Sequence, residues 1–185
     1  MLTKKHITLG LIASMFMVAA CKKKEIYSVI PLIEYKTAHF YQNAEGVDTL
    51  MVLVFSFKDG DGDIGLTQAD TSAPFNPVLD PVNNNKLINP YYNNLYIDYF
   101  ELVNGTYQSL KTPFGNDTLR YPFRFESLTP EGRHKAIRGD IEVGISPVPL
   151  AYNPQSDTVM YRFFIYDRAL HKSNIAESPA LIWKR

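Results

Sequence analysis

The sequence predicts an all-β domain, and three observations support this fold class. Aromatic residues are abundant, with 12 Tyr and 11 Phe among 185 residues, and aromatic side chains favour strands. Twelve prolines interrupt the chain, and few stretches favour a helix. No segment repeats its apolar residues with the period of a convincing amphipathic helix. The composition, 45% apolar and 21% charged, suits one globular domain with a proper core.

Two strands are predicted before the middle of the chain. Residues 26–35 form the first, and Pro31 within it suits an edge position because proline cannot donate a ladder hydrogen bond. Residues 38–48 are polar and are predicted to form a turn. Residues 49–58 are apolar on both faces, which is typical of a central strand covered on both sides, at least through its middle.

The remaining strands are predicted in the second half of the chain. Asn104-Gly105 is a strong hairpin signal, and a strand-like segment lies on each side of it. One later segment alternates apolar and polar residues as a half-buried strand does, and another is weakened by Pro122. These predicted strands cover residues 95–103, 106–111, 118–126, 137–145, 158–166 and 180–184.

Seven or eight strands with turn signals between them predict an antiparallel β-sandwich over residues 26–185, of the immunoglobulin or fibronectin type III-like kind. A closed barrel with a similar number of strands is the alternative fold.

One stretch, residues 67–94, has no strand pattern and contains four prolines. A loop of this length in a compact domain is either functional or loosely ordered.

Residues 1–20 have the features of a signal peptide. Two lysines precede an apolar segment that is too short to span a membrane comfortably. The segment ends in Val18-Ala19-Ala20-Cys21, which resembles the lipobox of bacterial lipoproteins. This resemblance implies cleavage before Cys21 and acylation of its sulfur and its new amine, so that residues 21–25 form a short tether to the membrane. The alternative is an ordinary secretory signal with an incidental cysteine.

Residues 59–65 form an acidic loop directly after the apolar segment 49–58. In this loop Asp59, Asp61 and Asp63 alternate with glycine. Carboxylates this close repel one another unless a cation, solvent or a donor-rich turn compensates. Calcium prefers six to eight oxygen ligands in flexible loops, so we expect calcium or a similar cation here. The alternative is a structural turn in which the Asp side chains accept hydrogen bonds from nearby backbone amides.

The carboxylate spacing resembles the start of an EF-hand loop, and Asp70 falls at its twelfth position. The sixth position holds Ile64 in place of glycine, and the preceding segment is a predicted strand. The resemblance to an EF-hand therefore covers the ligand spacing alone.

Sandwich topology offers further ligands. The strand before the acidic loop and the penultimate strand would end at the same end of the sandwich, so residues 167–174 would face the acidic loop. Asp167 is then a predicted fourth carboxylate ligand, and Asn174 a predicted further ligand. Alternatively, Arg168 or Lys172 neutralises the cluster without any metal.

Three segments of the chain occur together: the lipobox with Cys21, the segment Asp167-Arg168-Ala169 with Lys172-Ser173-Asn174, and Phe57-Lys58-Asp59-Gly60-Asp61-Gly62-Asp63-Ile64-Gly65. In this combination the chain resembles small envelope lipoproteins common in Bacteroidota, which carry an immunoglobulin-like sandwich. The resemblance implies a lipid-anchored protein of the outer membrane without catalytic activity. In that phylum, acidic residues after the cysteine are linked to surface export. Lysines follow Cys21 here, which favours the periplasmic face over the cell surface.

Several function classes lack support in the sequence. The net charge is zero, so no basic field for nucleic acid is expected. The histidines are scattered and Cys21 is the only cysteine, so a zinc site is not expected. The motifs of serine hydrolases, P-loop enzymes and dinucleotide-binding enzymes do not occur. We therefore expect a non-enzymatic protein with a structural or accessory role, in an envelope complex for example.

Tyr91, Tyr92 and Tyr96 lie at the end of the long irregular stretch, among many asparagines. Aromatic rings and amides are what a glycan or peptide groove uses, with the rings stacking and the amides fixing orientation. A glycan- or peptide-binding module of an envelope complex is therefore the alternative function. The competing interpretation is that these rings pack under the loop as a small additional core.

Overall fold

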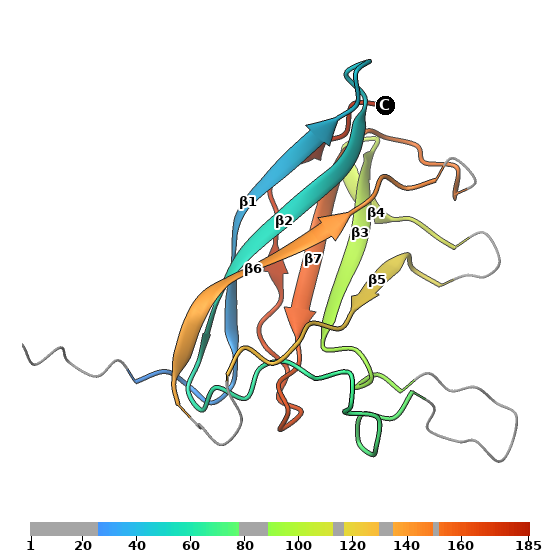
Figure 1. Cartoon of the computed structure of the whole chain (residues 1–185). Coiled ribbons are helices and arrows are strands. Elements are labelled where there is room, and N and C mark those ends of the chain that lie inside the picture. The colour runs from blue at the N-terminus through green and yellow to red at the C-terminus, as the bar shows by residue number, and fades with distance from the viewer. Residues whose placement is uncertain (1–25, 78–88, 113–116, 130–134, 150–151) are drawn as a thin grey trace, which may run out of the picture.

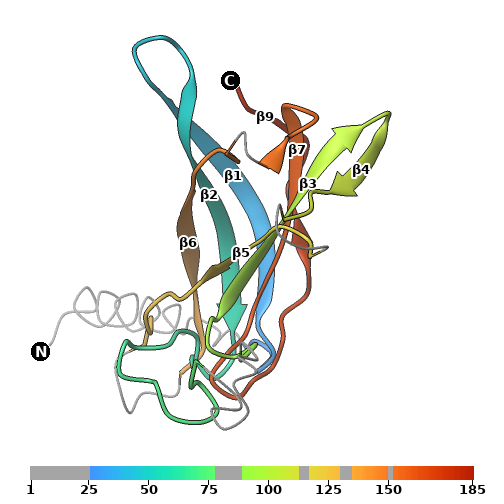
Figure 2. The same ribbon diagram turned by 90° about the vertical axis from the view of Figure 1, so that its right-hand side faces the viewer.

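The computed structural model describes residues 26–77, 89–112, 117–129, 135–149 and 152–185. These residues form two antiparallel sheets that face each other (Figures 1 and 2). The predicted all-β class is confirmed, and two separate sheets are present in place of one closed sheet. The predicted signal peptide, Cys21 and the tether lie outside the described residues. In the described ranges, no helix is both long and apolar enough to cross a membrane.

The smaller sheet has the order β1-β2-β6, formed by β1 (Leu32–Gln42), β2 (Asp48–Asp59) and β6 (Ile137–Ile145). The predicted central position of the second strand is confirmed. Its inner face is closed, with Met51, Leu53, Phe55 and Phe57 all buried, whereas Val52 on the other face is half-buried. Val54, on that same face in the middle of the strand, is buried, so the expectation of cover on both faces is met in the middle of β2 and not along its whole length.

The larger sheet is built on the pair β3 (Leu95–Val103) and β7 (Thr158–Ile165). Each outer position is divided between two short strands. On the β3 side these are β4 (Thr106–Ser109) and β5 (Arg120–Phe123). On the β7 side they are β8 (Ala176–Glu177) and β9 (Leu181–Ile182).

Aromatic side chains fill the space between the sheets. Phe55 of β2 and Phe163 of β7 have ring centroids 5.0 Å apart, which joins the two layers. Trp183 is buried and its Nε1 donates a hydrogen bond of 3.1 Å to the hydroxyl of Tyr161. Each such side chain contributes roughly 1.5–3 kcal/mol through burial, which explains why an aromatic-rich sequence forms this core.

The first strand differs from its prediction. It begins at Leu32 and continues to Gln42, so residues predicted as a polar turn belong to β1. Phe40 points inward and packs edge-on against Trp183, with a centroid distance of 5.1 Å. The actual turn is short because the Asn43 side-chain oxygen accepts hydrogen bonds from the amides of Glu45 and Val47. An edge strand needs only one apolar face, which is why its polar residues resembled a loop.

Candidate metal centre

The acidic loop and the segment after β7 lie side by side. β2 and β7 both end at the end of the sandwich opposite the C-terminus (Figure 1). Ile64 and Asp167 form an antiparallel bridge, and the Arg168 amide donates a hydrogen bond of 3.2 Å to the Asp63 carbonyl. The predicted contact between these two loops is therefore confirmed.

Asp59 is held by one carboxylate oxygen and presents the other. The residue is fully buried, and its Oδ2 accepts hydrogen bonds from the amides of Gly62 at 2.7 Å and Asp63 at 3.1 Å. Its Oδ1 is also buried, and no described residue donates a hydrogen bond to it. A buried carboxylate oxygen without a partner costs free energy, and this atom is available to bind a cation.

Asp61 and Asp63 complete the group. Asp63 Oδ2 accepts a hydrogen bond of 3.0 Å from the Ala169 amide, which ties the side chain to the facing loop. The Oδ1 atoms of both residues are buried, and in the described part of the chain neither has a hydrogen-bond partner. One carboxylate oxygen from each of the three aspartates lies within 4.8 Å of the others. Two ligands of one calcium ion can be about 5 Å apart, since each Ca–O distance is about 2.3–2.6 Å. The three carboxylates therefore fit a single ion.

The raised pKa values of the clustered aspartates are also consistent with a cation site. Burial and the neighbouring charge of Asp61 raise the pKa of Asp59 to about 7. Burial, followed by the charges of Asp167 and Asp61, raises the pKa of Asp63 to about 6. Without a cation, Asp59 is partly protonated near neutral pH and Asp63 is protonated in mildly acidic solution, and a bound cation would replace those protons.

Asp167 lies beside the cluster, but both of its oxygens are engaged. Oδ1 accepts a hydrogen bond from the His171 amide at 2.7 Å, and Oδ2 lies 2.8 Å from His171 Nδ1. This hydrogen bond and the charge of Asp167 raise the pKa of His171. Asp167 therefore adds negative charge to the site, while its side chain is positioned by His171. This pairing of His171 with Asp167 was not predicted from the sequence.

Asn174 lies outside the carboxylate group. Its Oδ1 accepts a hydrogen bond from the Ile33 amide and its Nδ2 donates one to the Ile33 carbonyl, both at 2.8 Å. The Asn174 side chain therefore makes the two hydrogen bonds to Ile33 that the backbone of a neighbouring strand would make. It fastens the start of β1 to the segment after β7, and both of its polar atoms are used in doing so.

The cations considered as alternatives bind other groups. Arg168 donates to both oxygens of Asp70, at 2.7 and 2.8 Å, and this holds the pKa of Asp70 well below its usual range. Lys172 places its ammonium nitrogen 3.8 Å from the centroid of the Phe164 ring. Asp70, at the twelfth EF-hand position, is thus neutralised by Arg168.

The loop glycines allow other backbone segments to approach closely. Gly62 has φ +74°, and a Cβ on it would overlap the carbonyl oxygen of Lys135. Thr129 Oγ1 also lies beside Gly62, and this buried hydroxyl has no hydrogen-bond partner among the residues described. Thr129 is therefore a further oxygen next to the acidic loop. Sequence reasoning missed it because only the folded chain brings it there.

The three tyrosines of the predicted groove pack within the protein. Tyr91 lies edge-on to Tyr166 at 5.1 Å between centroids, and Tyr96 stacks on Phe164 at 5.5 Å. The Arg124 guanidinium lies 5.0 Å from the centroid of Tyr92. These contacts support the interpretation as an additional small core on the outer face of the larger sheet.

The asparagines near these tyrosines bind backbone groups. The Asn94 side chain accepts from the Phe125 amide and donates to its carbonyl, both at 2.9 Å. The Asn89 side chain donates to the carbonyls of Pro74 and Asn76. These amides brace the long irregular stretch from inside.

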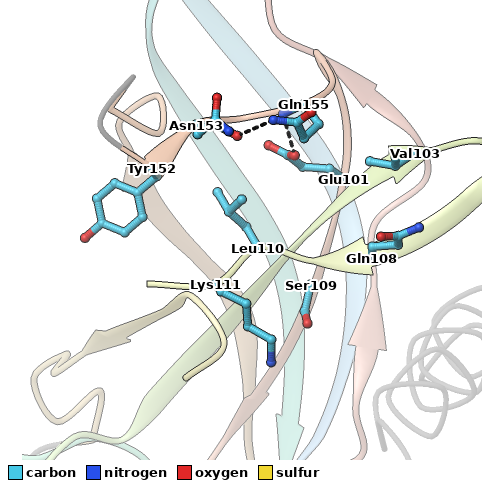
Figure 3. Close-up of a pocket in the computed structure, with 9 residues that line it drawn as sticks. All are labelled: Glu101, Val103, Gln108, Ser109, Leu110, Lys111, Tyr152, Asn153 and Gln155. Carbon is cyan, nitrogen blue, oxygen red and sulfur yellow. Dashed lines mark hydrogen bonds between the residues drawn. The ribbon is translucent and has the colours of Figure 1, made fainter. Parts of the chain in front are cut away.

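A separate pocket of about 300 Å³ lies beside the β3–β4 hairpin (Figure 3). Glu101 is buried in its wall, where its carboxylate accepts hydrogen bonds from the Gln155 amide at 2.8 Å and the Tyr99 hydroxyl at 2.9 Å. Gln108, Lys111 and other polar groups also line the pocket. It has the size and polarity for a small polar ligand.

Comparisons of the chain with models of protein families, with curated proteins and with solved structures found no match. We therefore infer function from the acidic loop, the pocket and the N-terminal sequence.

Proposed function

We propose that this protein is a non-enzymatic, lipid-anchored protein of the cell envelope, whose β-sandwich is closed at one end by a calcium ion. One observation carries the metal assignment. Three carboxylate oxygens converge within 4.8 Å, while the buried Oδ1 of Asp59 has no partner within the described ranges. A hydrogen-bonded structural turn would account for the Oδ2 atoms of Asp59 and Asp63 but leaves the Oδ1 atoms unexplained.

Calcium fits this site for chemical reasons. All three ligands are hard oxygen donors, and calcium accepts irregular arrangements of six to eight such ligands. Asp61 and Asp63 are half-buried, so water can fill the remaining positions. Magnesium requires near-ideal octahedral geometry at shorter distances, which a glycine-rich loop supplies less readily.

The role of the ion would be structural. The acidic loop follows β2 of the smaller sheet, and the facing loop follows β7 of the larger sheet. An ion held by the acidic loop, and supported by the Asp63–Ala169 hydrogen bond, would strengthen the connection between the two layers. Binding to the native state alone then adds directly to the free energy of unfolding.

The anchor rests on the N-terminal sequence. We place the acyl chains on Cys21 and the protein at the outer membrane, facing the periplasm, with an envelope complex as its partner. Loss of incorporated palmitate in Cys21→Ser would support this anchor.

The way the strands are divided between the two sheets supports the immunoglobulin-like type of sandwich. In this assignment β1, β2 and β6 correspond to strands A, B and E, and β3 and β7 correspond to strands C and F.

Thermal unfolding with calcium or with a chelator tests the metal assignment. At ten times its dissociation constant, calcium is expected to add about 1.4 kcal/mol, which raises Tm by roughly 3–6 °C. Asp61→Asn should lose most of this shift. Glu142→Gln, on the exposed face of β6, is the matched control and should keep it. Melting curves that are identical with calcium and with chelator in the wild type would exclude the metal.

The alternative function, a glycan- or peptide-binding module, is favoured by the pocket beside Glu101. A glycan array or peptidoglycan pulldown tests it with three proteins. These are the wild type, Gln108→Ala in the pocket, and the double variant Tyr91→Ala with Tyr92→Ala. Binding that is lost in one of the variants would locate the groove. Binding unaffected by both would exclude these two surfaces.

A further inference from the structure

Exposed aliphatic side chains are concentrated at one end of the sandwich. Eight large hydrophobic residues are exposed in the described part of the chain, and six of them lie at the end that carries the acidic loop. Their exposed fractions are 90% for Ile26, 49% for Val29, 49% for Ile30, 43% for Leu32, 46% for Leu128 and 56% for Ile175. Exposed apolar residues gathered in one region indicate an interaction surface.

Backbone contacts place these six residues around the acidic loop. Gly60 approaches the backbone of Tyr27 and Ser28 so closely that a Cβ would overlap it. Leu32 pairs with Lys58 at the end of β2. The Leu128 amide donates a hydrogen bond of 3.3 Å to the Ile64 carbonyl. Ile175 follows Asn174, whose side chain is bonded to Ile33.

The two other exposed hydrophobic residues lie at the opposite end. Tyr41 pairs with Leu50 near the β1–β2 turn, and Ile182 pairs with Thr158 at the start of β7. β1 has 11 residues and therefore spans about 36 Å between the two ends. Figure 1 shows the described chain starting at one end and the C-terminus at the other.

The chain length before Ile26 limits which surface can cover this end. Five residue steps separate Cys21 from Ile26. A fully extended chain spans at most about 3.6 Å per residue, so Ile26 lies within about 18 Å of Cys21. If Cys21 carries acyl chains, the acidic-loop end is held at the head groups. The opposite end, one strand length further away, is free to point into solution.

We propose that the acidic-loop end of the sandwich docks on the bilayer, with Ile26, Val29 and Ile30 inserted among the lipid head groups. This inference rests on the lipid anchor of the proposed function. The chemistry is consistent, because these three side chains are aliphatic and Lys22, Lys23 and Lys24 of the tether attract anionic head groups. A cation bound by the three aspartates would reduce their repulsion from the same head groups.

The test uses the mature lipoprotein in phospholipid vesicles. A single cysteine is introduced by Ile30→Cys and labelled with a fluorophore that brightens in apolar surroundings. Ile182→Cys, exposed at the opposite end, is the matched control. With nitroxide-bearing lipids, the label at position 30 is expected to be quenched at least three-fold more than the label at position 182. Val29→Cys provides a second variant if Ile30→Cys fails to fold.

Each other outcome overturns the docking. Equal quenching at the two positions, or none at either, means that the domain does not dock by this end. Brightening at position 30 that rises with protein density without lipid quenching means that a second copy covers the surface.

The lipid anchor is tested separately by thiol labelling of the wild type, because Cys21 is its only cysteine. A wild type that takes up the thiol label refutes the lipid anchor, whereas an unlabelled wild type with an unquenched Ile30→Cys refutes the docking alone.

Discussion

At the scale of single residues, the two carboxylate oxygens of Asp59, and likewise those of Asp63, have different roles. In each, Oδ2 accepts backbone hydrogen bonds that fix the side chain. Oδ1 is buried without a partner in the ranges that the structure describes. A side chain that is fixed in this way needs little reorganisation to bind an ion, which favours binding.

The raised pKa values of Asp59 and Asp63 predict how the metal-free protein responds to pH. The folded-state pKa values, about 7 and about 6, lie above the unfolded value of 3.8. The native state therefore binds more protons, and its free energy of unfolding falls as pH rises through this interval. With chelator, Tm should fall between pH 5 and pH 7.5.

Saturating calcium should flatten this dependence, whereas Asp59→Asn should remove only the part that Asp59 contributes, because burial, Asp167 and Asp61 still raise the pKa of Asp63. The range above pH 5 is chosen because Asp70, whose pKa is lowered by Arg168, stays ionised there. A Tm that rises with pH in the chelated protein would show that the carboxylates are already compensated within the fold.

Gly62 provides a second prediction at this scale. Gly62→Ala should lower the free energy of unfolding by about 1–3 kcal/mol, because its φ of +74° and the Lys135 carbonyl both oppose a Cβ. Gly46→Ala is the matched control, since Gly46 has φ +80° with nothing within 4 Å of a Cβ. Urea unfolding of both variants should show the larger loss for Gly62→Ala. Equal losses would mean that the close approach contributes nothing.

At the scale of elements, the strands that could be predicted are those whose own sequence shows a strand or turn pattern. The bounds of β3 and β6 match the prediction at both ends. The hairpin after β3 uses Asn104 and Gly105 with φ of 51° and 77°, as a type I′ turn requires. β8 has two residues and no pattern, so it could not be predicted. The bounds of β1 depend on its pairing with β2, which local sequence does not show.

Asn174 provides a prediction about how the start of β1 is held in place. Asn174→Ala should cost about 1–2 kcal/mol, because the amide and carbonyl of Ile33 lose their partners. Hydrogen exchange should become faster at the start of β1. The loss of stability should be the same with calcium and with chelator. If the variant instead loses the calcium-dependent shift, Asn174 acts as a ligand.

At the scale of the whole molecule, the topology brought the acidic loop and Asp167 to the same end, which sequence reasoning anticipated. The His171–Asp167 pair and the position of Thr129 could not be anticipated. The position of Thr129 depends on how segments distant in sequence pack. The His171–Asp167 pair is four residues apart and depends on the conformation of the loop after β7.

The same scale gives a prediction about local stability. Calcium should slow hydrogen exchange at residues 59–66 and 167–171, because an ion at the loop end would oppose separation of the two loops. The β1–β2 turn, residues 43–47, lies at the opposite end and serves as the internal control. Protection spread evenly over both ends would indicate general stabilisation in place of a local site.

The divided outer strands of the larger sheet have a further consequence. A lipid anchor confines many copies of a protein to one plane, where sheet edges meet often. β4, β5, β8 and β9 have two to four residues each, so neither outer position of this sheet offers a long continuous edge. Short edges give a neighbouring chain few hydrogen bonds to complete. If the protein is anchored as proposed, crowded copies cannot readily join through the larger sheet, and the long edges left for such pairing are β1 and β6 of the smaller sheet.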